Sequence, residues 1–261
     1  MPVEIVATER PEAFVVRLDG RDQSHVDLAD PTRLDFPYVR RIGDVLDACA
    51  PPSAPLRVLH VGGAGLTVPR YVATTRPGSA QVVLEPDAEV TERVRADLPL
   101  PRRSGIKVRP VAGRPGLAAV RDGSQDVVVV DAFAGGRVPG DLVTTEAALD
   151  HARVLAAEGL LVLNLVDVAP FAWARRALAA VRTALPEVLV TAEPATLRAR
   201  RAGNLLVVAS RGTVPTAALT AHVATSPAPY RVLGPAAVSD TLGGGTPFTD
   251  ADAEDSPATQ V

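Results

Sequence analysis

A glycine-rich turn is the feature of the sequence most suited to binding a ligand. The run VGGAGLTVPRY, residues 61–71, follows an apolar strand-like stretch and leads into a helix-like one. Glycines in such a turn, here Gly62, Gly63 and Gly65, let the backbone approach a ligand closely, and the start of the next helix offers unpaired N–H groups. Because the pattern is not a complete G-x-G-x-x-G, a plain strand-to-helix turn explains it equally well when it is taken alone.

Glu85 makes the binding interpretation stronger. It ends the next apolar run, within LEPD, close to the position about 20 residues beyond the turn where Rossmann folds place an acid for the ribose hydroxyls. The alternative is a strand-end carboxylate that faces water. Asp87, two residues later, is predicted to cap the following helix.

Asp131 is the second candidate acid. It follows the run QDVVVV and should therefore lie at the carboxyl edge of a parallel sheet, where ligands of such folds bind. There it could act as a general base toward an ammonium group, bind a cation, or simply cap the next loop. His60 is expected in the core, whereas His25, nearer the same edge, has no assigned role. The four histidines are scattered and Cys49 is the only cysteine, so no metal site is predicted.

The elements that would position these residues alternate regularly from residue 56 onward. Continuous apolar runs are separated by helix-like stretches, a pattern typical of a parallel sheet covered by helices on both faces. The strands are expected at 57–63, 81–87, 106–111, 125–133 and 159–167, and the helices at 66–75, 88–97, 115–121 and 141–157.

The two ends of the chain add smaller elements. Extended runs at 3–7, 13–18 and 23–28, a helix over 36–48, a helix near 170–184 and a hairpin of strands 187–193 and 204–210 are expected. The predicted fold is α/β: a Rossmann-like, methyltransferase-type sheet of five parallel strands plus a closing hairpin, with a small N-terminal β-hairpin appendage. We expect an appendage at 1–35, a nucleoside-binding domain at 36–212 and a partly disordered extension at 213–261, with 243–261 a mobile tail.

Composition narrows the classes of function. The chain has 261 residues, a formal net charge of -3 and a pI near 5.8, which gives no electrostatic footprint for nucleic acid or an anionic membrane. No apolar run approaches the roughly 20 residues that cross a bilayer, and charges interrupt the first residues where a signal peptide would be apolar. A cytoplasmic location is therefore expected.

The ordered set of motifs resembles the spermidine synthase family, and more closely the spermidine-synthase-like proteins of GC-rich bacteria. The resemblance covers roughly residues 14–210. It rests on LDG at 18–20, Gln23, DFPYVRRI at 35–42, the glycine turn, LEPD at 84–87, VVVVDAFAGG at 127–136 and VLAAEGLLVLNL at 154–165.

The resemblance implies a reaction and a set of roles. Family members transfer an aminopropyl group from decarboxylated S-adenosylmethionine to putrescine, so the implied partners are a nucleoside co-substrate, with no tightly bound cofactor, and an amine. A homodimer is implied too. By the same resemblance, Glu85 is the ribose-binding acid, Asp131 the catalytic acid, Tyr38 an amine-site tyrosine and Gln23 a donor-site glutamine.

Departures from the family pattern fall mostly in the amine half. Gly65, Ala112 and Ala134 stand where the family has aspartates, and Arg40 replaces a glutamate. A dicationic amine needs anions to offset the loss of its hydration, so these changes argue for an acceptor other than putrescine.

Two further hypotheses stay open. One is a non-catalytic descendant that binds a nucleoside or a partner protein. The other is a methyltransferase that uses S-adenosylmethionine on a small molecule, although no N-P-P-Y-like motif follows the fourth strand of the sheet.

Overall fold

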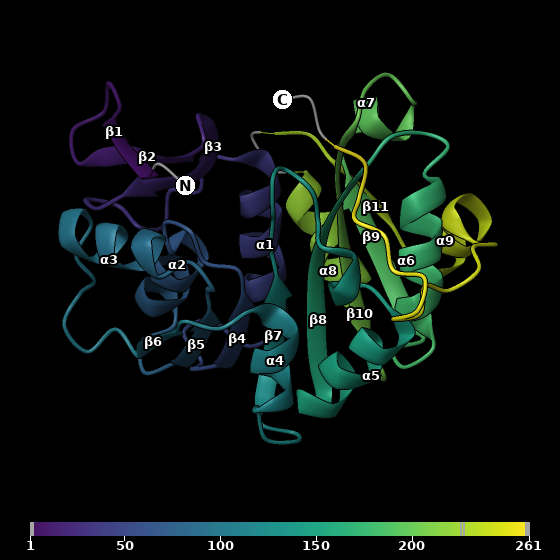
Figure 1. The fold of residues 1–261 in the computed structure, drawn as a ribbon. Coiled ribbons are helices and arrows are strands. Elements are labelled where there is room, and N and C mark those ends of the chain that lie inside the picture. The colour runs from purple at the N-terminus through teal and green to yellow at the C-terminus, as the bar shows by residue number, and fades with distance from the viewer. Residues whose placement is uncertain (1–2, 225, 227, 259–261) are drawn as a thin grey trace. The chain divides into compact units, whose positions relative to one another are not determined.

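The computed structural model describes residues 3–224, 226 and 228–258. The chain forms two compact units, one up to Gly116 and one from Leu117 onward, which we call the N-terminal unit and the C-terminal unit (Figure 1).

The N-terminal unit begins with a three-stranded antiparallel sheet of β1 (Val3–Ala7), β2 (Ala13–Leu18) and β3 (Arg21–Asp27). Asp19 and Gly20 connect β2 to β3 with φ of 51° and 73°. Two residues with positive φ give the turn whose twist matches the twist of paired strands, and this explains the Asp-Gly pair. We call this the N-terminal sheet.

The rest of the N-terminal unit is a parallel α/β segment. Its strands are β4 (Arg57–Val61), β5 (Ala80–Leu84) and β6 (Ile106–Arg109), and its helices are α1 (Pro37–Ala48), α2 (Thr67–Thr75), α3 (Ala88–Asp97) and α4 (Gly113–Ala118). β5 pairs in parallel with both β4 and β6. One cluster of buried side chains joins the N-terminal sheet to this segment, with members Val16, Val26, Leu66, Val83, Val90, Val94 and Leu98.

The C-terminal unit contains a second set of strands. They are β7 (Gln125–Val130), β8 (Leu155–Asp167), β9 (Glu187–Ala192), β10 (Gly203–Ser210) and β11 (Arg231–Leu233). β7 and β8 are parallel, and β10, β9 and β11 continue from β8 as antiparallel neighbours. The helices are a 3-10 turn at Gly140–Leu142, α5 (Thr145–Val154), α6 (Ala172–Arg182), α7 (Pro194–Leu197), α8 (Thr216–Val223) and α9 (Pro235–Leu242).

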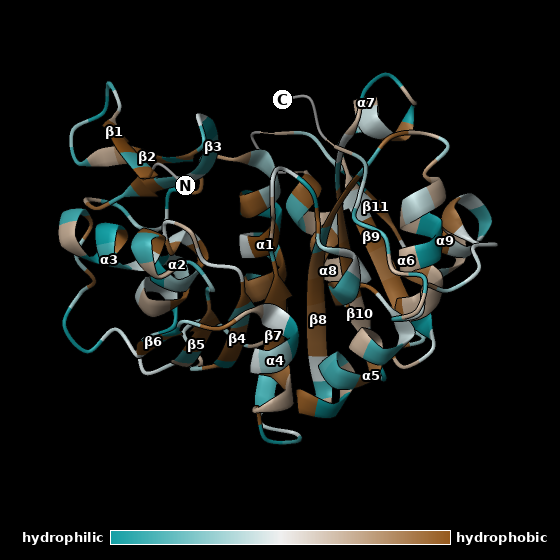
Figure 2. Cartoon of the chain, in the orientation of Figure 1, coloured by the Kyte–Doolittle hydropathy of each residue, from teal (hydrophilic) through white to brown (hydrophobic). Residues whose placement is uncertain are grey.

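The expected fold class is confirmed: the chain is a mixed α/β protein of the methyltransferase-like Rossmann type, with a small N-terminal sheet. Hydrophobic residues are concentrated on β4, β5, β7, β8, β9 and β10, whereas β3 is largely hydrophilic (Figure 2). Within the described residues, no helix is long and apolar enough to cross a membrane.

The start of β8 differs from the expectation. Residues 155–157, which the sequence assigns to the end of the helix 141–157, instead open the strand, because Leu155 pairs with Gln125 of β7. Sheet pairing here overrides the helix propensity of alanine. The domain boundaries at 35/36 and 212/213 stay a prediction.

The expectation of a mobile tail at 243–261 is wrong for residues 243–258. Phe248 is buried, with its ring 6.1 Å from that of Trp173, and its carbonyl accepts a hydrogen bond from the Thr145 amide at 2.8 Å. Ser256 is also buried and its Oγ accepts a hydrogen bond from the Val138 amide at 2.9 Å. A polar, glycine-rich composition suggested disorder, yet one aromatic anchor and backbone hydrogen bonds order this segment. Residues 259–261 lie outside the described residues.

Candidate functional site

The glycine turn leaves β4 through a strained backbone. The Gly62 amide donates to the Leu84 carbonyl at 2.9 Å and its φ is 86°, a value that favours glycine. Ala64 and Leu66 also have positive φ, 32° and 60°. Non-glycine residues adopt this region only where the surrounding structure holds them there, and such residues cluster at ligand sites.

Glu85 holds the turn from the end of β5. Its Oε2 accepts hydrogen bonds from the amides of Gly63 at 3.0 Å and Ala64 at 3.2 Å, and its Oε1 accepts one from the Asp87 amide at 3.1 Å. A carboxylate offers about four acceptor positions, so these bonds leave about one, on Oε1. Since the turn's amides point at the protein's own anion, the turn does not present them to a phosphate. This arrangement disfavours a dinucleotide pyrophosphate and suits a ligand that donates a hydroxyl.

Gly65 faces the N-terminal sheet. A Cβ atom at this position would lie 2.8 Å from Ser24 Cβ, 2.8 Å from Val26 Cγ2 and 3.2 Å from Val16 Cγ2. The Gly65 amide donates to Ser24 Oγ at 3.1 Å. Strand β3 therefore occupies the space into which any side chain at position 65 would have to extend.

Two further contacts fix the turn to its surroundings. Thr67 Oγ1 donates to the His25 carbonyl on β3 at 2.8 Å. The buried Arg70 donates from Nε to the Gly65 carbonyl at 3.3 Å and from Nη1 to the Pro99 carbonyl at 3.0 Å. Burial lowers the pKa of Arg70 to about 10, so it remains charged at neutral pH. The N-terminal sheet and Arg70 together hold the backbone of the turn.

His60 is a core residue, as expected. It lies on β4 just before the turn, and its Nε2 is 2.9 Å from Gln81 Oε1, while Gln81 Nε2 donates to the Pro69 carbonyl at 3.0 Å. Complete burial lowers the pKa of His60 to about 4, so its ring is neutral. Asp87 caps α3 as predicted, with its side chain accepting from the Val90 amide at 3.1 Å.

Asp131 belongs to the C-terminal unit, directly after β7. Its Oδ1 accepts a hydrogen bond from Asn164 Nδ2 of β8 at 2.9 Å. Asn164 is 1% exposed. The acid at the end of β7 is therefore anchored from inside the sheet.

Gln23 and Tyr38, two further residues assigned by resemblance, occupy separate elements of the N-terminal unit. Gln23 lies on β3, one residue before Ser24, and is partly buried. Tyr38 is in the first turn of α1, with its ring 6.1 Å from that of Phe36. The structure brings Gly63, Gly65 and Glu85 into one hydrogen-bonded arrangement, which reaches β3 through Ser24.

Sequence reasoning missed Ser24, Arg70 and Asn164. Ser24 directly follows the candidate residue Gln23, but a single serine in a strand belongs to no motif whose spacing would mark it as functional. Arg70 lies inside the quoted glycine-turn run. Asn164 interrupts the apolar run GLLVLNLVD, and a lone amide in a fully buried strand is a signal that could have been used, because such a group needs a partner.

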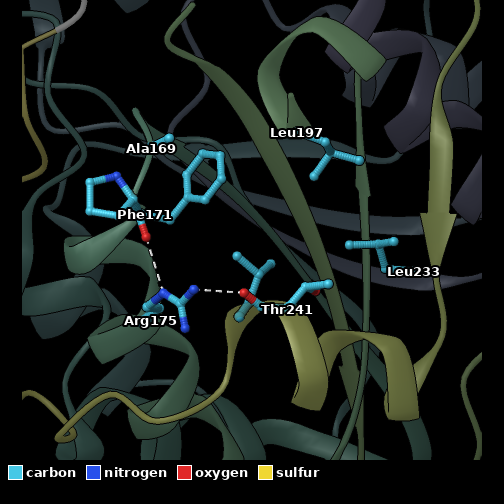
Figure 3. A pocket seen from close by; sticks show the side chains of 8 residues that line it. Ala169, Phe171, Arg175, Leu197, Leu233 and Thr241 are labelled. Atoms are coloured by element: carbon cyan, nitrogen blue, oxygen red, sulfur yellow. Dashed lines mark hydrogen bonds between the residues drawn. The ribbon is translucent and has the colours of Figure 1, made fainter. Parts of the chain in front are cut away.

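The C-terminal unit also contains a hollow of about 280 Å³ (Figure 3). Its walls are mainly apolar and come from Ala169, Pro170, Phe171, Leu197, Leu233 and Leu242, with Arg175 and Thr241. The Arg175 guanidinium donates to the carbonyls of Pro170, Thr241 and Gly243 at 3.1, 2.7 and 2.6 Å. It thereby satisfies the carbonyls at the end of α9, and none of the predicted site residues lines the hollow.

A metal centre finds no support in the part of the chain that the structure describes, where no three His, Cys, Asp or Glu side chains gather.

Comparison with curated proteins gives two distant relatives. No protein-family model matches the chain. A polyamine aminopropyltransferase of Chromobacterium violaceum is 27% identical over 142 residues, which is 54% of this chain and 53% of that protein. The polyamine aminopropyltransferase of Vibrio vulnificus is 28% identical over 134 residues, 51% of this chain and 44% of that protein. The chain thus aligns with about half the length of these relatives.

Comparison with solved structures covers more of the chain. The crystal structure of a probable spermidine synthase from Corynebacterium glutamicum has a TM-score of 0.88 at 26% identity and covers 99% of this chain and 94% of its own. A spermidine synthase in complex with the transition-state analogue AdoDATO has a TM-score of 0.56 at 18% identity, covering 83% of this chain and 71% of its own. Human methyltransferase-like protein 13 in complex with SAH has a TM-score of 0.59 at 19% identity, covering 79% and 92%. The last two share the fold.

Proposed function

We propose that the chain is a member of the spermidine-synthase-like family and that it binds an S-adenosyl-type nucleoside through the glycine turn and Glu85. Decarboxylated S-adenosylmethionine, S-adenosylmethionine and methylthioadenosine all fit this description. The solved relatives that hold AdoDATO and SAH support this class of ligand.

The observation that carries the proposal is the engagement of Glu85 with the turn. Its carboxylate already neutralises the N–H groups that would attract a phosphate, and one acceptor position remains on Oε1. A ribose hydroxyl can donate to that position directly. A second hydroxyl would have to replace the longer of the two turn bonds, the one from the Ala64 amide.

For chemistry, we propose aminopropyl transfer to an amine other than putrescine. The bond between the sulfonium sulfur and the aminopropyl carbon breaks, its electron pair stays on sulfur, and the amine nitrogen forms the new bond. Asp131 takes the proton that the nitrogen loses, and Tyr38 and Gln23 contact the two substrates. The sulfonium is a good leaving group, so orientation and proton acceptance are the enzyme's main tasks.

The absence of an acid at position 65 supports a change in one of the two substrates, either in the acceptor amine or in the aminopropyl group of the nucleoside donor. The neighbours of Gly65 are Ser24, Val26 and Val16, and an aspartate there would overlap them. Strand β3 therefore leaves no space at position 65 for an acidic side chain that could pair with an ammonium group.

Calorimetric titration with methylthioadenosine tests the binding proposal. We expect wild-type binding and a loss of about 10- to 100-fold in Glu85→Gln, because the amide cannot accept at every position that the carboxylate fills. Glu92→Gln, an exposed acid on α3, is the matched control and should leave the affinity unchanged. Absence of binding by the wild type would contradict the proposal.

A turnover assay tests the transfer step separately. The protein is incubated with decarboxylated S-adenosylmethionine and a panel of amines, and methylthioadenosine release is followed. We expect release with at least one amine other than putrescine and its loss in Asp131→Asn. Binding without release with any amine would instead support the non-catalytic descendant, and methylation of a small molecule would support a methyltransferase.

A further inference from the structure

Asn164 interrupts the apolar interior of β8. Its neighbours Leu163 and Leu165 are fully buried and Asn164 itself is 1% exposed. Burying an amide without hydrogen bonds is costly, so its partners decide whether this position is tolerated.

Those partners form a chain across three strands of the C-terminal unit. Asn204 Nδ2 of β10 donates to Asn164 Oδ1 at 3.1 Å, and Asn164 Nδ2 donates to Asp131 Oδ1 at 2.9 Å. Both donors point in the same direction, toward the carboxylate at the end of β7. The Asn164 oxygen accepts from Asn204, which fixes the amide with its nitrogen toward Asp131.

We infer that Asn164 and Asn204 are positioning residues that fix the orientation of the Asp131 carboxyl group as a hydrogen-bond acceptor, so that the end of β7 receives a cation or a hydrogen-bond donor. In catalytic terms this inference rests on the proposed function, in which Asp131 accepts the amine's proton. A hydrogen bond donated to a carboxylate favours its charged form, and a chain of such bonds strengthens each member.

The arrangement restricts the ligand at this position. An ammonium or hydroxyl group can donate to an ionised carboxylate, whereas a carboxylate or phosphate would be repelled by it. Because Asn164 is held inside the sheet, Asp131 Oδ1 has little freedom to turn toward a ligand. The donor is therefore expected to approach a carboxylate whose orientation is already set, which lowers the entropy lost on binding.

The test is a pH titration of the Asp131 side chain, followed by the ¹³C carboxyl signal in protein with labelled aspartate and assigned with Asp131→Asn. In Asn164→Leu the midpoint of this titration should move to higher pH by about one unit, a roughly tenfold change in proton affinity. Asn204→Leu keeps the direct donor and should give a smaller shift in the same direction.

Thr191→Val is the matched control. Thr191 is as buried as Asn164 and lies on β9, the strand that pairs with β10, outside the amide chain. This variant should leave the Asp131 titration unchanged. If Asn164→Leu fails to fold, Asn164→Asp replaces the donor with a second acid, and the two carboxyls should then titrate in two coupled steps.

An unchanged Asp131 midpoint in folded Asn164→Leu, or a single-step titration in Asn164→Asp, would overturn the inference. The titration needs neither nucleoside nor amine. A protein that binds no nucleoside but shows the shift would contradict the proposed function alone, and nucleoside binding without the shift would contradict this inference alone.

Discussion

The N-terminal sheet and the C-terminal tail of residues 243–258 are both additions to a Rossmann-like core, and they are attached in different ways. The sheet is held by polar bonds at the glycine turn, from the Gly65 amide to Ser24 and from Thr67 to the His25 carbonyl. The tail is held by a buried aromatic ring, Phe248, and by backbone bonds remote from the turn along the chain. The sheet is therefore part of the candidate site, whereas the tail supports the fold of its own unit. Changes at the first attachment should alter stability and ligand binding together, and changes at the second should alter stability alone.

The largest effect is expected for Gly65→Asp. The new Cβ would lie 2.8 Å from atoms of Ser24 and Val26, and the charge would be buried between apolar side chains. We expect a loss of roughly 4 kcal/mol in the free energy of unfolding, together with loss of methylthioadenosine binding. Chemical denaturation and calorimetry measure the two effects. Gly123→Asp, at a glycine with φ of 62° and no neighbour within 4 Å, is the control and should cost only about 1 kcal/mol.

Phe248→Ala tests the other attachment. Removal of this buried ring should lower the free energy of unfolding by roughly 3–4 kcal/mol, because the Arg176 guanidinium, 3.9 Å from the ring centre, and Trp173 would lose their packing partner. Methylthioadenosine affinity should stay within about twofold of the wild type, measured below the melting temperature. Leu149→Ala, at a leucine that is 56% exposed, should change neither quantity. A large loss of affinity in Phe248→Ala would remove the distinction between the two attachments.

Arg70→Met should affect both properties more mildly. The variant keeps much of the apolar stem but leaves the carbonyls of Gly65, Leu98 and Pro99 without this donor. We expect a loss of roughly 2–3 kcal/mol in the free energy of unfolding and of about tenfold in nucleoside affinity, because the Gly65 carbonyl in the turn loses its hydrogen bond from Arg70. Arg93→Met, which removes an exposed i,i+4 ion pair on α3, is the comparison and should cost at most about 0.5 kcal/mol. Equal effects of the two variants would contradict the role given to Arg70.

The smallest expected effect is a pH dependence from His60. Its folded-state pKa is about 4 against an ordinary value of 6.5, so the unfolded state binds more protons between these values and stability falls as the pH is lowered through this window. From pH 7 to pH 5 the loss should be roughly 2 kcal/mol, measured by urea denaturation. In His60→Leu this part of the pH dependence should vanish. A variant with the slope of the wild type would show that other groups cause it.

Elements with a regular pattern of apolar residues, and residues at a typical spacing from a motif, could be predicted from the sequence. Helix α3 lies where the sequence placed it, at 88–97, and Asp87 caps it, because both depend on local signals. The spacing between the glycine turn and Glu85 indicated that both belong to one site, and the Gly63 amide does donate a hydrogen bond to Glu85. The placement of Glu85 was therefore predictable, although the number of its acceptor positions already in use was not.

The remaining features depend on contacts between distant residues. Ser24 accepts a hydrogen bond from the amide of Gly65, 41 residues later, and the tail is ordered by partners that lie 68 to 119 residues before it. The polar, glycine-rich composition of the tail as a whole predicted disorder, because an average over many residues conceals the effect of one buried aromatic residue, Phe248. In β8, sheet pairing at Leu155 outweighed the local preference of an alanine-rich stretch.

The packing of the tail also bears on how the chain is synthesised. The amides of Val138 and Gly140 find their acceptors on Ser256 and Asp255, and the Trp173 indole donates to the Glu254 carbonyl. Until the ribosome has added residues 254–256, these two amides and the indole lack their hydrogen-bond acceptors. The C-terminal unit therefore completes its folding only after Ser256 has emerged from the ribosome.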